Sequence, residues 1–307
     1  MQSYAMGIDI GGTKIAIGLV NTSGEVVSRS VLSTNLTISP QDMMLEVAKE
    51  VNRLVEQQHL LKEDLLGVGI GAPGPIDAPD GMITCPPNLP NWVDFPVVQF
   101  MQEALGLTVT LQNDANCAAL AEKWIGAAQD ANSFVYVTIS TGIGSGIYVD
   151  GRMLSGLRGN AGDIGHIVID PSQGTCTCGQ KGCFEWIASG TAIARRASDA
   201  LLRNVSTKEV FELYANHDNT IVPIIAQTFE YIGMGCVTLI NMLDPEMIVI
   251  GGGVSSVGDP LFDAARRYVR QFALNPAGRE TRIVKAQLGS DAGLIGAAAL
   301  VVRNARD

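Results

Sequence analysis

The sequence has no excess of positive charge. Its 307 residues include 21 lysines and arginines against 31 aspartates and glutamates, so the formal net charge is −10 and the isoelectric point is about 4.8. A protein that binds the phosphate backbone of a nucleic acid needs a basic face, so this charge argues against a nucleic-acid partner. A small anionic ligand stays compatible with it, because backbone N–H groups can hold an anion.

Two kinds of hydrophobic segment are also missing. No run of 18 or more apolar residues is present, which argues against a transmembrane helix. The first residues, MQSYAMGIDIGGTK, lack the basic start and the apolar stretch of a secretory signal. We therefore expect a cytoplasmic protein without a membrane partner, in which the six cysteines are not structural disulfides.

Glycine, in contrast, is abundant. The chain contains 34 glycines, 47% hydrophobic residues and 6% aromatic residues, a composition that suits an α/β protein with many tight turns. A chain of this length can bury a large core and favours two domains over one.

The order of the predicted elements repeats along the chain. Strands predicted at 4–10, 15–20 and 25–34 are separated by short turns and form an antiparallel meander. The same strand–turn–strand–turn order begins again at FVYVTIS (134–140), without matching letter by letter. The sequence therefore predicts duplicated halves with a cleft between them. Residues 75–96 are predicted to be mainly loop, and helices are predicted near 190–203, 206–215 and 221–243.

Three glycine-rich turns follow apolar strands. The first, GIDIGGTK (7–14), is not a P-loop, because Thr13 precedes Lys14 and a strand follows instead of a helix. It is better interpreted as a hairpin that bends around a phosphate, with Asp9 holding Mg²⁺ directly or through water, although a plain hairpin also fits. STGIGSG (140–146) and GGGV (251–254) are the others, and together the three indicate a nucleotide lying between two lobes.

One segment, GHIVIDPSQGTCTCGQKGCFE (165–185), concentrates metal-binding residues. His166, Cys176, Cys178 and Cys183 are four ligands of the types that tetrahedral Zn²⁺ takes. No CxxC pair is present, which weakens a redox interpretation and leaves a metal-free thiol cluster as the alternative. Four protein ligands leave no open coordination position, so the predicted zinc is structural and holds the loop that carries Glu185.

The motifs GIDIGGTK, GIGAPGPID, PNLPNW, NDAN, STGIGSG, GDIGH, CTCGQKGCFE and VIGGGV occur in this order across nearly the whole chain. They resemble those of the ROK family of bacterial sugar kinases and repressors, and its glucokinase-type members above all. The resemblance implies a two-lobed, actin/hexokinase-like (ribonuclease H-like) α/β fold, with duplicated β-meander/helix halves and a central cleft. We expect an N-terminal lobe of residues 1–115 with 291–307, and a C-terminal lobe of residues 116–290 that carries the zinc segment.

The resemblance also implies ATP-dependent phosphorylation of a hexose, glucose first, at its 6-hydroxyl. Helix-start statistics alone favour Asp114 as a simple helix cap, but Asn113–Asp114 matches the family's catalytic pair and so marks Asp114 as the general base. The sugar ligands are then expected to be Asn88, Asn113, Asp114, Asp163, His166 and Glu185. The residues expected around Mg²⁺–ATP are Asp9, Gly11, Gly12, Thr13, Lys14, Thr141 and Gly142, with Gly252 and Gly253 near the adenosine.

Two positions depart from the family pattern. Asp163 stands in GDIGH, where family kinases usually have Glu, and Ser140 stands where Gly usually precedes Thr-Gly. The Asp side chain is one methylene shorter, so we expect its sugar contact to use a water molecule or a different sugar. We expect both changes to bear on the choice of sugar more than on the reaction.

Two alternatives stay open at this point. The first is a kinase for another hexose or hexosamine, such as mannose, fructose, N-acetylglucosamine or N-acetylmannosamine. The second is a sugar-sensing ROK protein without catalysis. Repressors of the family carry an N-terminal helix-turn-helix, and because the first strand is predicted to start near Tyr4, we expect none here. The resemblance and the apolar helix predicted at 221–243 also indicate a homodimer or homotetramer.

Overall fold

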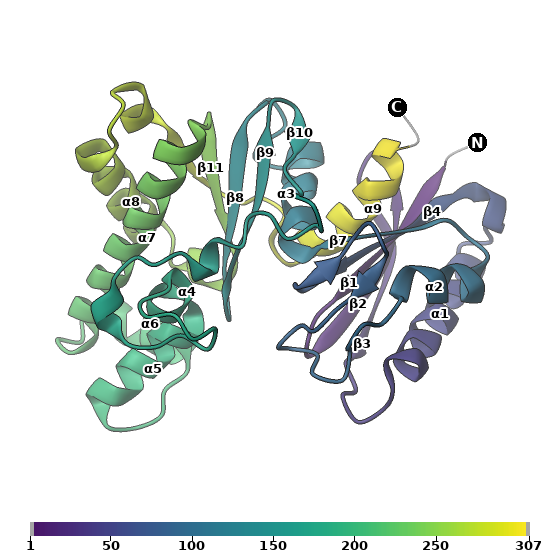
Figure 1. Ribbon diagram of the computed structural model, residues 1–307, viewed down its shortest axis with the longest axis horizontal. Helices are drawn as coiled ribbons and strands as arrows, with labels where there is room; N and C mark the ends of the chain where they lie inside the picture. The colour runs from purple at the N-terminus through teal and green to yellow at the C-terminus, as the bar shows by residue number, and fades with distance from the viewer. Residues whose placement is uncertain (1–2, 305–307) are drawn as a thin grey trace. The chain divides into compact units, whose positions relative to one another are not determined.

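The computed structural model describes residues 3–304, and the side chains up to residue 302. The chain divides into two compact units. Unit 1 contains the chain up to Asp130, the segment Met153–Ala161 and the chain from Leu288 on, whereas unit 2 contains Ala131–Arg152 and Gly162–Gln287. Each unit combines one five-stranded sheet with helices (Figure 1).

The sheet of unit 1 has the strand order β3-β2-β1-β4-β7. Strands β1, β2 and β3 form an antiparallel meander, and β4 and β7 run parallel to β1. The strands are β1 (Tyr4–Ile10), β2 (Lys14–Asn21), β3 (Val26–Ser33), β4 (Leu65–Ala72) and β7 (Val109–Asn113), with a separate hairpin of β5 (Ile76–Asp77) and β6 (Met82–Ile83). The helices are α1 (Pro40–Gln57), α2 (Val97–Leu105), α3 (Asp114–Ile125) and α9 (Ala292–Asn304).

The sheet of unit 2 repeats this order as β10-β9-β8-β11-β12. Strand β8 pairs antiparallel with β9 and parallel with β11, and β11 pairs parallel with β12. The predicted duplication and the α/β class are therefore confirmed. The strands are β8 (Phe134–Ile139), β9 (Ile143–Val149), β10 (Arg152–Met153), β11 (Met247–Gly251) and β12 (Arg282–Lys285). The helices are α4 (Phe184–Ala188), α5 (Gly190–Leu201), α6 (Thr207–Ala215), α7 (Ile221–Leu243) and α8 (Asp259–Phe272).

Each unit has its own hydrophobic core. The core of unit 2 is built around α7, whose 23 residues lie where the apolar pattern predicts a helix. By length and composition alone this helix could cross a membrane, and it is the one such helix in the described part of the chain. It packs against α8 and α4, and its buried side chains include Ile225, Phe229 and Leu239. Its apolar character is therefore explained by its place in the core.

The short elements are where the structure departs from the sequence-based expectation. The segment predicted as loop contains the β5–β6 hairpin, in which Ile76 pairs with Ile83. Helix α4 has only five residues and was not predicted. Elements of two to five residues contain too few positions to show a period of 2 or 3.6. The division between the units also lies after α3 and not at residues 115/116, because α3 packs on α9.

Helix α9 packs backbone to backbone on three other elements of unit 1. A Cβ atom on Gly7 of β1 would lie 2.1 Å from the carbonyl oxygen of Leu294, and one on Gly69 of β4 would lie 1.7 Å from that of Ala297. On the helix itself, a Cβ on Gly296 would lie 1.6 Å from the carbonyl oxygen of Cys117 in α3. Only glycine fits at these positions, since a real Cβ would displace main chain.

Gly296→Ala tests this close packing. Alanine at a helix interior normally stabilises by about 1 kcal/mol relative to glycine, but here we expect a net loss of about 3 kcal/mol or more because the methyl group collides with main chain. Gly18→Ala is the matched control, since its methyl meets only the flexible end of Leu294, and we expect a loss of about 1 kcal/mol. Urea unfolding measures both, and a stabilised Gly296→Ala protein would contradict the packing.

Candidate functional site

The two carboxylates of unit 1 that the sequence marks as candidate site residues, Asp9 and Asp114, lie where parallel strands end. Asp9 of β1 pairs in register with Gly71 of β4, and Gly71 pairs with Gln112 of β7. Adjacent strands lie about 4.8 Å apart, so Asp9 and the end of β7 are about 10 Å apart at one edge of the sheet. Open α/β sheets bind their ligands at this edge.

The predicted phosphate turn is a tight hairpin that a neighbouring strand supports. The N–H of Gly11 donates to the carbonyl of Lys14 at 2.9 Å, and the Thr34 hydroxyl donates to the carbonyl of Gly11 at 2.7 Å. A Cβ on Gly12 would lie 3.0 Å from the Cβ of Asn88. The structure therefore brings Asn88 to this turn, as well as Thr34, which no sequence signal marked.

Asp9 is partly buried and touches the first turn of α9. A Cβ on Gly293 would lie 2.5 Å from Asp9 Oδ2, so this helix start must be glycine for the carboxylate to fit. Burial raises the pKa of Asp9 to about 6, and the positive charge of Lys14 offsets this only in part. The site thus holds a carboxylate in surroundings that favour its neutral form, which a bound cation would reverse.

Asp114 is the first residue of α3, directly after β7. The helix cap is Asn113, whose Oδ1 accepts from the N–H groups of Ala115 at 3.0 Å and Asn116 at 3.4 Å. Asp114 Oδ1 also accepts from the N–H of Ala115, at 2.8 Å. Since Asn113 performs the capping, capping alone does not explain an acidic residue at 114.

Unit 2 places its glycine turns at the ends of two adjacent parallel strands. Thr138 of β8 pairs with Gly251 of β11, so Thr141 and Gly142 follow one strand and Gly252 and Gly253 the next. The N–H of Gly190, at the start of α5, donates to the carbonyl of Ser140 at 2.7 Å. A Cβ on Gly252 would lie 2.4 Å from the carbonyl oxygen of Ile139. The predicted ATP-binding residues of unit 2 are therefore neighbours.

Glu185 links the predicted phosphate turn to the cysteine-rich segment within unit 2. Its Oε2 accepts from the N–H of Ile143 at 2.8 Å, and a Cβ on Gly142 would lie 2.3 Å from the same oxygen. Among the described residues, no hydrogen-bond donor reaches Oε1. One carboxylate oxygen thus fixes the turn, and the other can accept from a ligand.

The four predicted metal ligands lie together. One ligand atom from each of His166, Cys176, Cys178 and Cys183 lies within 4.8 Å of the others. The Sγ atoms of Cys178 and Cys183 are 3.6 Å apart, and Cys176 Sγ lies 3.7 Å from His166 Nδ1. Zn–S bonds of about 2.3 Å at tetrahedral angles give edges of about 3.7 Å. The donor set and spacing fit zinc, with Nδ1 as the histidine ligand.

The loop before this cluster is fixed to β9. The Ser145 hydroxyl donates to the carbonyl of Gly162 at 2.6 Å, and a Cβ on Gly162 would lie 2.9 Å from the carbonyl oxygen of Ser145. Asp163 follows and its side chain is exposed. The Gln180 side chain donates to the backbone carbonyl of His166 at 3.2 Å, so the cysteine-rich loop holds the main chain at His166.

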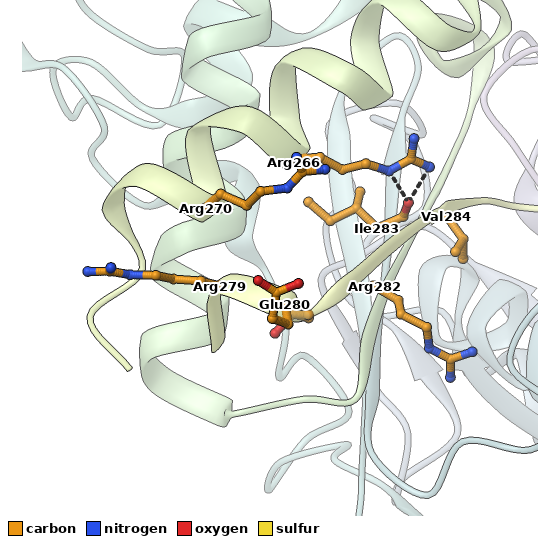
Figure 2. Close-up of a pocket in the computed structure, with 8 residues that line it drawn as sticks. Arg266, Arg270, Arg279, Glu280, Arg282, Ile283 and Val284 are labelled. Atoms are coloured by element: carbon orange, nitrogen blue, oxygen red, sulfur yellow. Dashed lines mark hydrogen bonds between the residues drawn. The ribbon is translucent and has the colours of Figure 1, made fainter. Parts of the chain in front are cut away.

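A separate pocket in unit 2 contains none of the predicted site residues. Its charged lining consists of Arg266, Arg270, Arg279, Arg282 and Glu280. Arg266 donates to the carbonyl of Ile283 from Nε at 3.1 Å and from Nη2 at 2.8 Å. Figure 2 shows the side chains of Arg279 and Arg282 pointing in different directions away from Glu280. The pocket therefore lacks the converging donors of an anion site.

The pKa of Asp9 gives a testable pH dependence of stability. The pKa of Asp9 is about 6 in the folded protein, against an ordinary value of 3.8. The contribution of this carboxyl to the free energy of unfolding is therefore fully present below about pH 4 and is lost as pH rises through 6. With a chelator present, we expect Asp9→Asn to exceed the wild type by about 2 kcal/mol at pH 7.5 and to equal it at pH 4. Urea unfolding measures this, with exposed Asp130→Asn as control. If the stability difference between Asp9→Asn and the wild type is the same at both pH values, the raised pKa of Asp9 is refuted.

Comparison with known proteins agrees with this geometry. The profile of the ROK family matches residues 5–304. A glucokinase of Halalkalibacterium halodurans is 37% identical over 97% of this chain and 94% of its own. The ROK hexokinase structure from Thermus thermophilus is 36% identical, covers 100% of both chains and has a TM-score of 0.86. A ROK family glucokinase structure from Streptomyces griseus, in complex with glucose and AMPPNP, is 30% identical over 97% and 99% of the two chains, with a TM-score of 0.80.

A family match over nearly the whole chain, together with relatives at this identity, places the protein by descent as well as by fold: the chain belongs to the ROK family.

Proposed function

We propose that this protein is an ATP-dependent hexose kinase that phosphorylates glucose at its 6-hydroxyl. The observation that carries the proposal is Asp114, a carboxylate at the end of β7 whose capping role is performed by its neighbour Asn113. The 37% identity to a glucokinase supports glucose as the sugar. The relative solved with glucose and AMPPNP supports ATP as the phosphoryl donor.

In this proposal Asp114 is the general base. It accepts the proton of the sugar 6-hydroxyl as that oxygen bonds to the γ-phosphorus, while the bond between the γ-phosphorus and the β,γ-bridging oxygen breaks and ADP leaves with the electron pair. The start of α3 suits this role, because the N-terminal N–H groups stabilise the carboxylate before the proton arrives.

The phosphates of ATP are assigned to the glycine turns, whose backbone permits close approach. Asp9 would hold Mg²⁺ directly or through water, and this ion would offset the phosphate charge during transfer. In unit 1 the assigned residues are Gly11, Gly12, Thr13 and Lys14. In unit 2 they are Thr141 and Gly142, with Gly252 and Gly253 beside the adenosine.

The sugar is assigned to polar groups that still have capacity to bind it. Asn113 uses Oδ1 for the helix cap and keeps its amide as a donor, and Glu185 keeps Oε1 as an acceptor. If Nδ1 of His166 binds metal, its Nε2–H is the group left for a hydroxyl. Asn88 and Asp163 complete the proposed set, and both side chains are exposed. The shorter Asp163 leaves space for a water molecule at its sugar contact.

We further propose that Zn²⁺ bound by the three cysteines and His166 orders the sugar-binding loop without taking part in the chemistry. All four coordination positions would be filled by protein, which leaves none for substrate. The metal would then fix the imidazole of His166 and, two residues after Cys183, the carboxylate of Glu185.

Asp114→Asn tests the base. We expect kcat for glucose to fall by about 10³-fold, because a positioned base contributes about 10²–10⁴-fold, with little change in the melting temperature. ADP release with Mg²⁺–ATP measures this against a panel of hexoses and N-acetylhexosamines. The exposed substitution Asp199→Asn is the control and should retain wild-type turnover.

The outcomes separate the alternatives. Turnover of glucose that Asp114→Asn loses, with none of 6-deoxyglucose, supports the proposal. Greater turnover of another sugar keeps the kinase and replaces the substrate. Calorimetric glucose binding without turnover by the wild type favours a sugar sensor.

Cys178→Ser tests the zinc. We expect one zinc per chain in the wild type, a strong loss of zinc in the variant, and a lower melting temperature together with a higher KM for glucose. Cys85→Ser, at an exposed cysteine outside the cluster, is the matched control and should keep the metal. Elemental analysis of the purified proteins measures the stoichiometry. A fully active wild-type protein without zinc would eliminate this role.

A further inference from the structure

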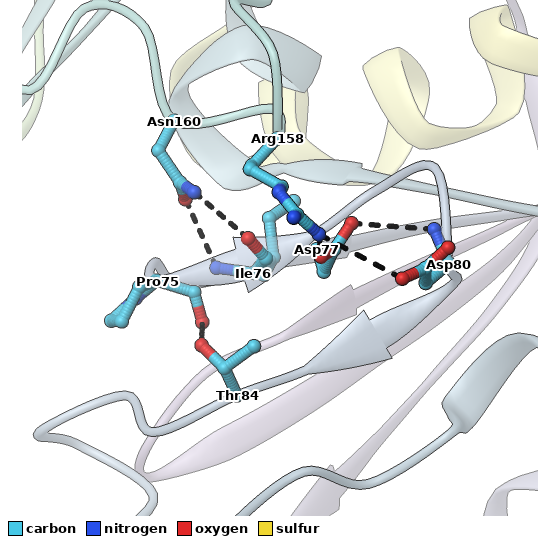
Figure 3. Close-up of polar contacts among 7 residues, drawn as sticks. All are labelled: Pro75, Ile76, Asp77, Asp80, Thr84, Arg158 and Asn160. Atoms are coloured by element: carbon cyan, nitrogen blue, oxygen red, sulfur yellow. Dashed lines mark hydrogen bonds and ion pairs between the residues drawn. The ribbon is translucent and has the colours of Figure 1, made fainter.

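A strap of nine residues, Met153–Ala161, belongs to unit 1, although the chain on both sides of it belongs to unit 2. No motif of the sequence marks it, and the proposed function assigns it no role. Within unit 1 it lies against the β5–β6 hairpin (Figure 3). Its contacts there indicate what it does.

Asn160 pairs with both backbone groups of a buried residue. Its Oδ1 accepts from the N–H of Ile76 at 3.0 Å, and its Nδ2 donates to the carbonyl of Ile76 at 2.8 Å (Figure 3). The N–H of Ala78 donates to the carbonyl of Arg158 at 2.9 Å, which continues the pairing along the hairpin. Without Asn160, both groups of Ile76 would lose this partner away from water.

Two more features fix the strap in register. Arg158 forms ion pairs with Asp77 and, at 3.8 Å, with Asp80. A Cβ on Gly159 would lie 2.8 Å from the Cβ of Ala78, so the strap runs as close to the hairpin as its backbone allows. The Arg158 side chain is largely exposed, so its ion pairs contribute less to the fixation than the part-buried bonds between Asn160 and the backbone of Ile76.

The fixed hairpin begins next to the proposed catalytic pair. A Cβ placed on Gly74, two residues before Ile76, would lie 3.3 Å from Asn113 Nδ2 and 3.5 Å from Asn160 Oδ1. The turn at Gly74 therefore lies between the two asparagine side chains, with little space on either side. Asn113 precedes Asp114, so the position of this turn limits where the start of α3 can lie.

The strap reaches the same place by a second route. The side-chain amide of Gln112 donates to the Ser155 hydroxyl at 3.2 Å. Gln112 Oε1 accepts from the N–H of Asn113 at 2.8 Å and from Asn116 Nδ2 at 3.1 Å. Gln112 thus connects the strap to the backbone that carries Asp114.

We propose that Asn160 is a positioning residue for the base: by fixing Ile76 and the turn at Gly74, it sets the orientation of Asn113–Asp114. This inference rests on the proposed kinase function. In this inference Asn160 contacts neither sugar nor ATP. The strap keeps the Asp114 carboxylate in the position and orientation that proton transfer from the sugar hydroxyl requires.

Asn160→Ala tests the inference in the full-length protein. We expect kcat for glucose to fall about 10-fold or more, with the KM for ATP within twofold of the wild type, because the hydrogen bonds of Asn160 go to Ile76, which is not assigned to ATP. Asn241→Ala is the matched control, since the Asn241 side chain also accepts from a distant backbone N–H, that of Leu274, and it should leave kcat unchanged. Melting temperatures of all the proteins are measured in parallel.

A second, milder variant keeps the test decisive if Asn160→Ala folds poorly. Ser155→Ala removes only the contact with Gln112, and we expect a smaller fall in kcat, again without a change in the KM for ATP. Arg158→Lys, which keeps the charge beside Asp77, should retain more activity than Arg158→Ala.

The outcomes distinguish the two proposals. If the wild type is active and both Asn160→Ala and Ser155→Ala fold with unchanged kcat, the positioning role alone is overturned. A wild type that phosphorylates none of the sugars in the panel overturns the proposed function and this inference together.

Discussion

The backbone contact of α9 with β1, β4 and α3 is the constraint on which unit 1 depends. Glycine at 7, 69 and 296 lets helix and strand backbones meet where any side chain would collide. The contact also determines the surroundings of the proposed site, because the same helix begins at Gly293 against the carboxylate of Asp9. The helix that stabilises the unit therefore also helps to bury the carboxylate of Asp9, to which we assign Mg²⁺.

The protein uses one sheet order twice, with different chemistry at the strand ends. In unit 1 the ends of the parallel strands carry Asp9 and Asp114. In unit 2 the ends of β8 and β11 carry glycine turns, and the cysteine-rich segment reaches the first of these through Glu185. Edge position is a property of the topology, so both units present their candidate site residues at the same place in the sheet.

Neighbouring residues divide structural and chemical tasks between them. Asn113 caps α3, so Asp114 is not needed for the cap, and Glu185 uses one oxygen for the turn and keeps the other for a ligand. Asn160 forms hydrogen bonds with the backbone N–H and C=O of buried Ile76, and no substrate contact is assigned to it. Asn113 and Asn160 thus support the backbone around Asp114, whereas Glu185 combines a structural and a ligand-binding oxygen in one side chain.

The sequence alone determined what depends on local patterns. Long periodic segments such as α7, the duplicated strand order and the motifs of the family could all be predicted, because each is carried by contiguous residues. The four side chains proposed to bind metal could be listed too, since their spacing within one loop is itself the signal. Only the tertiary structure decided the contacts of Gly293 with Asp9, Thr34 with Gly11, and Asn160 with Ile76. These partners are separated by 23 to 284 positions, and no local periodicity or turn chemistry links residues so far apart until the packed backbone brings them together.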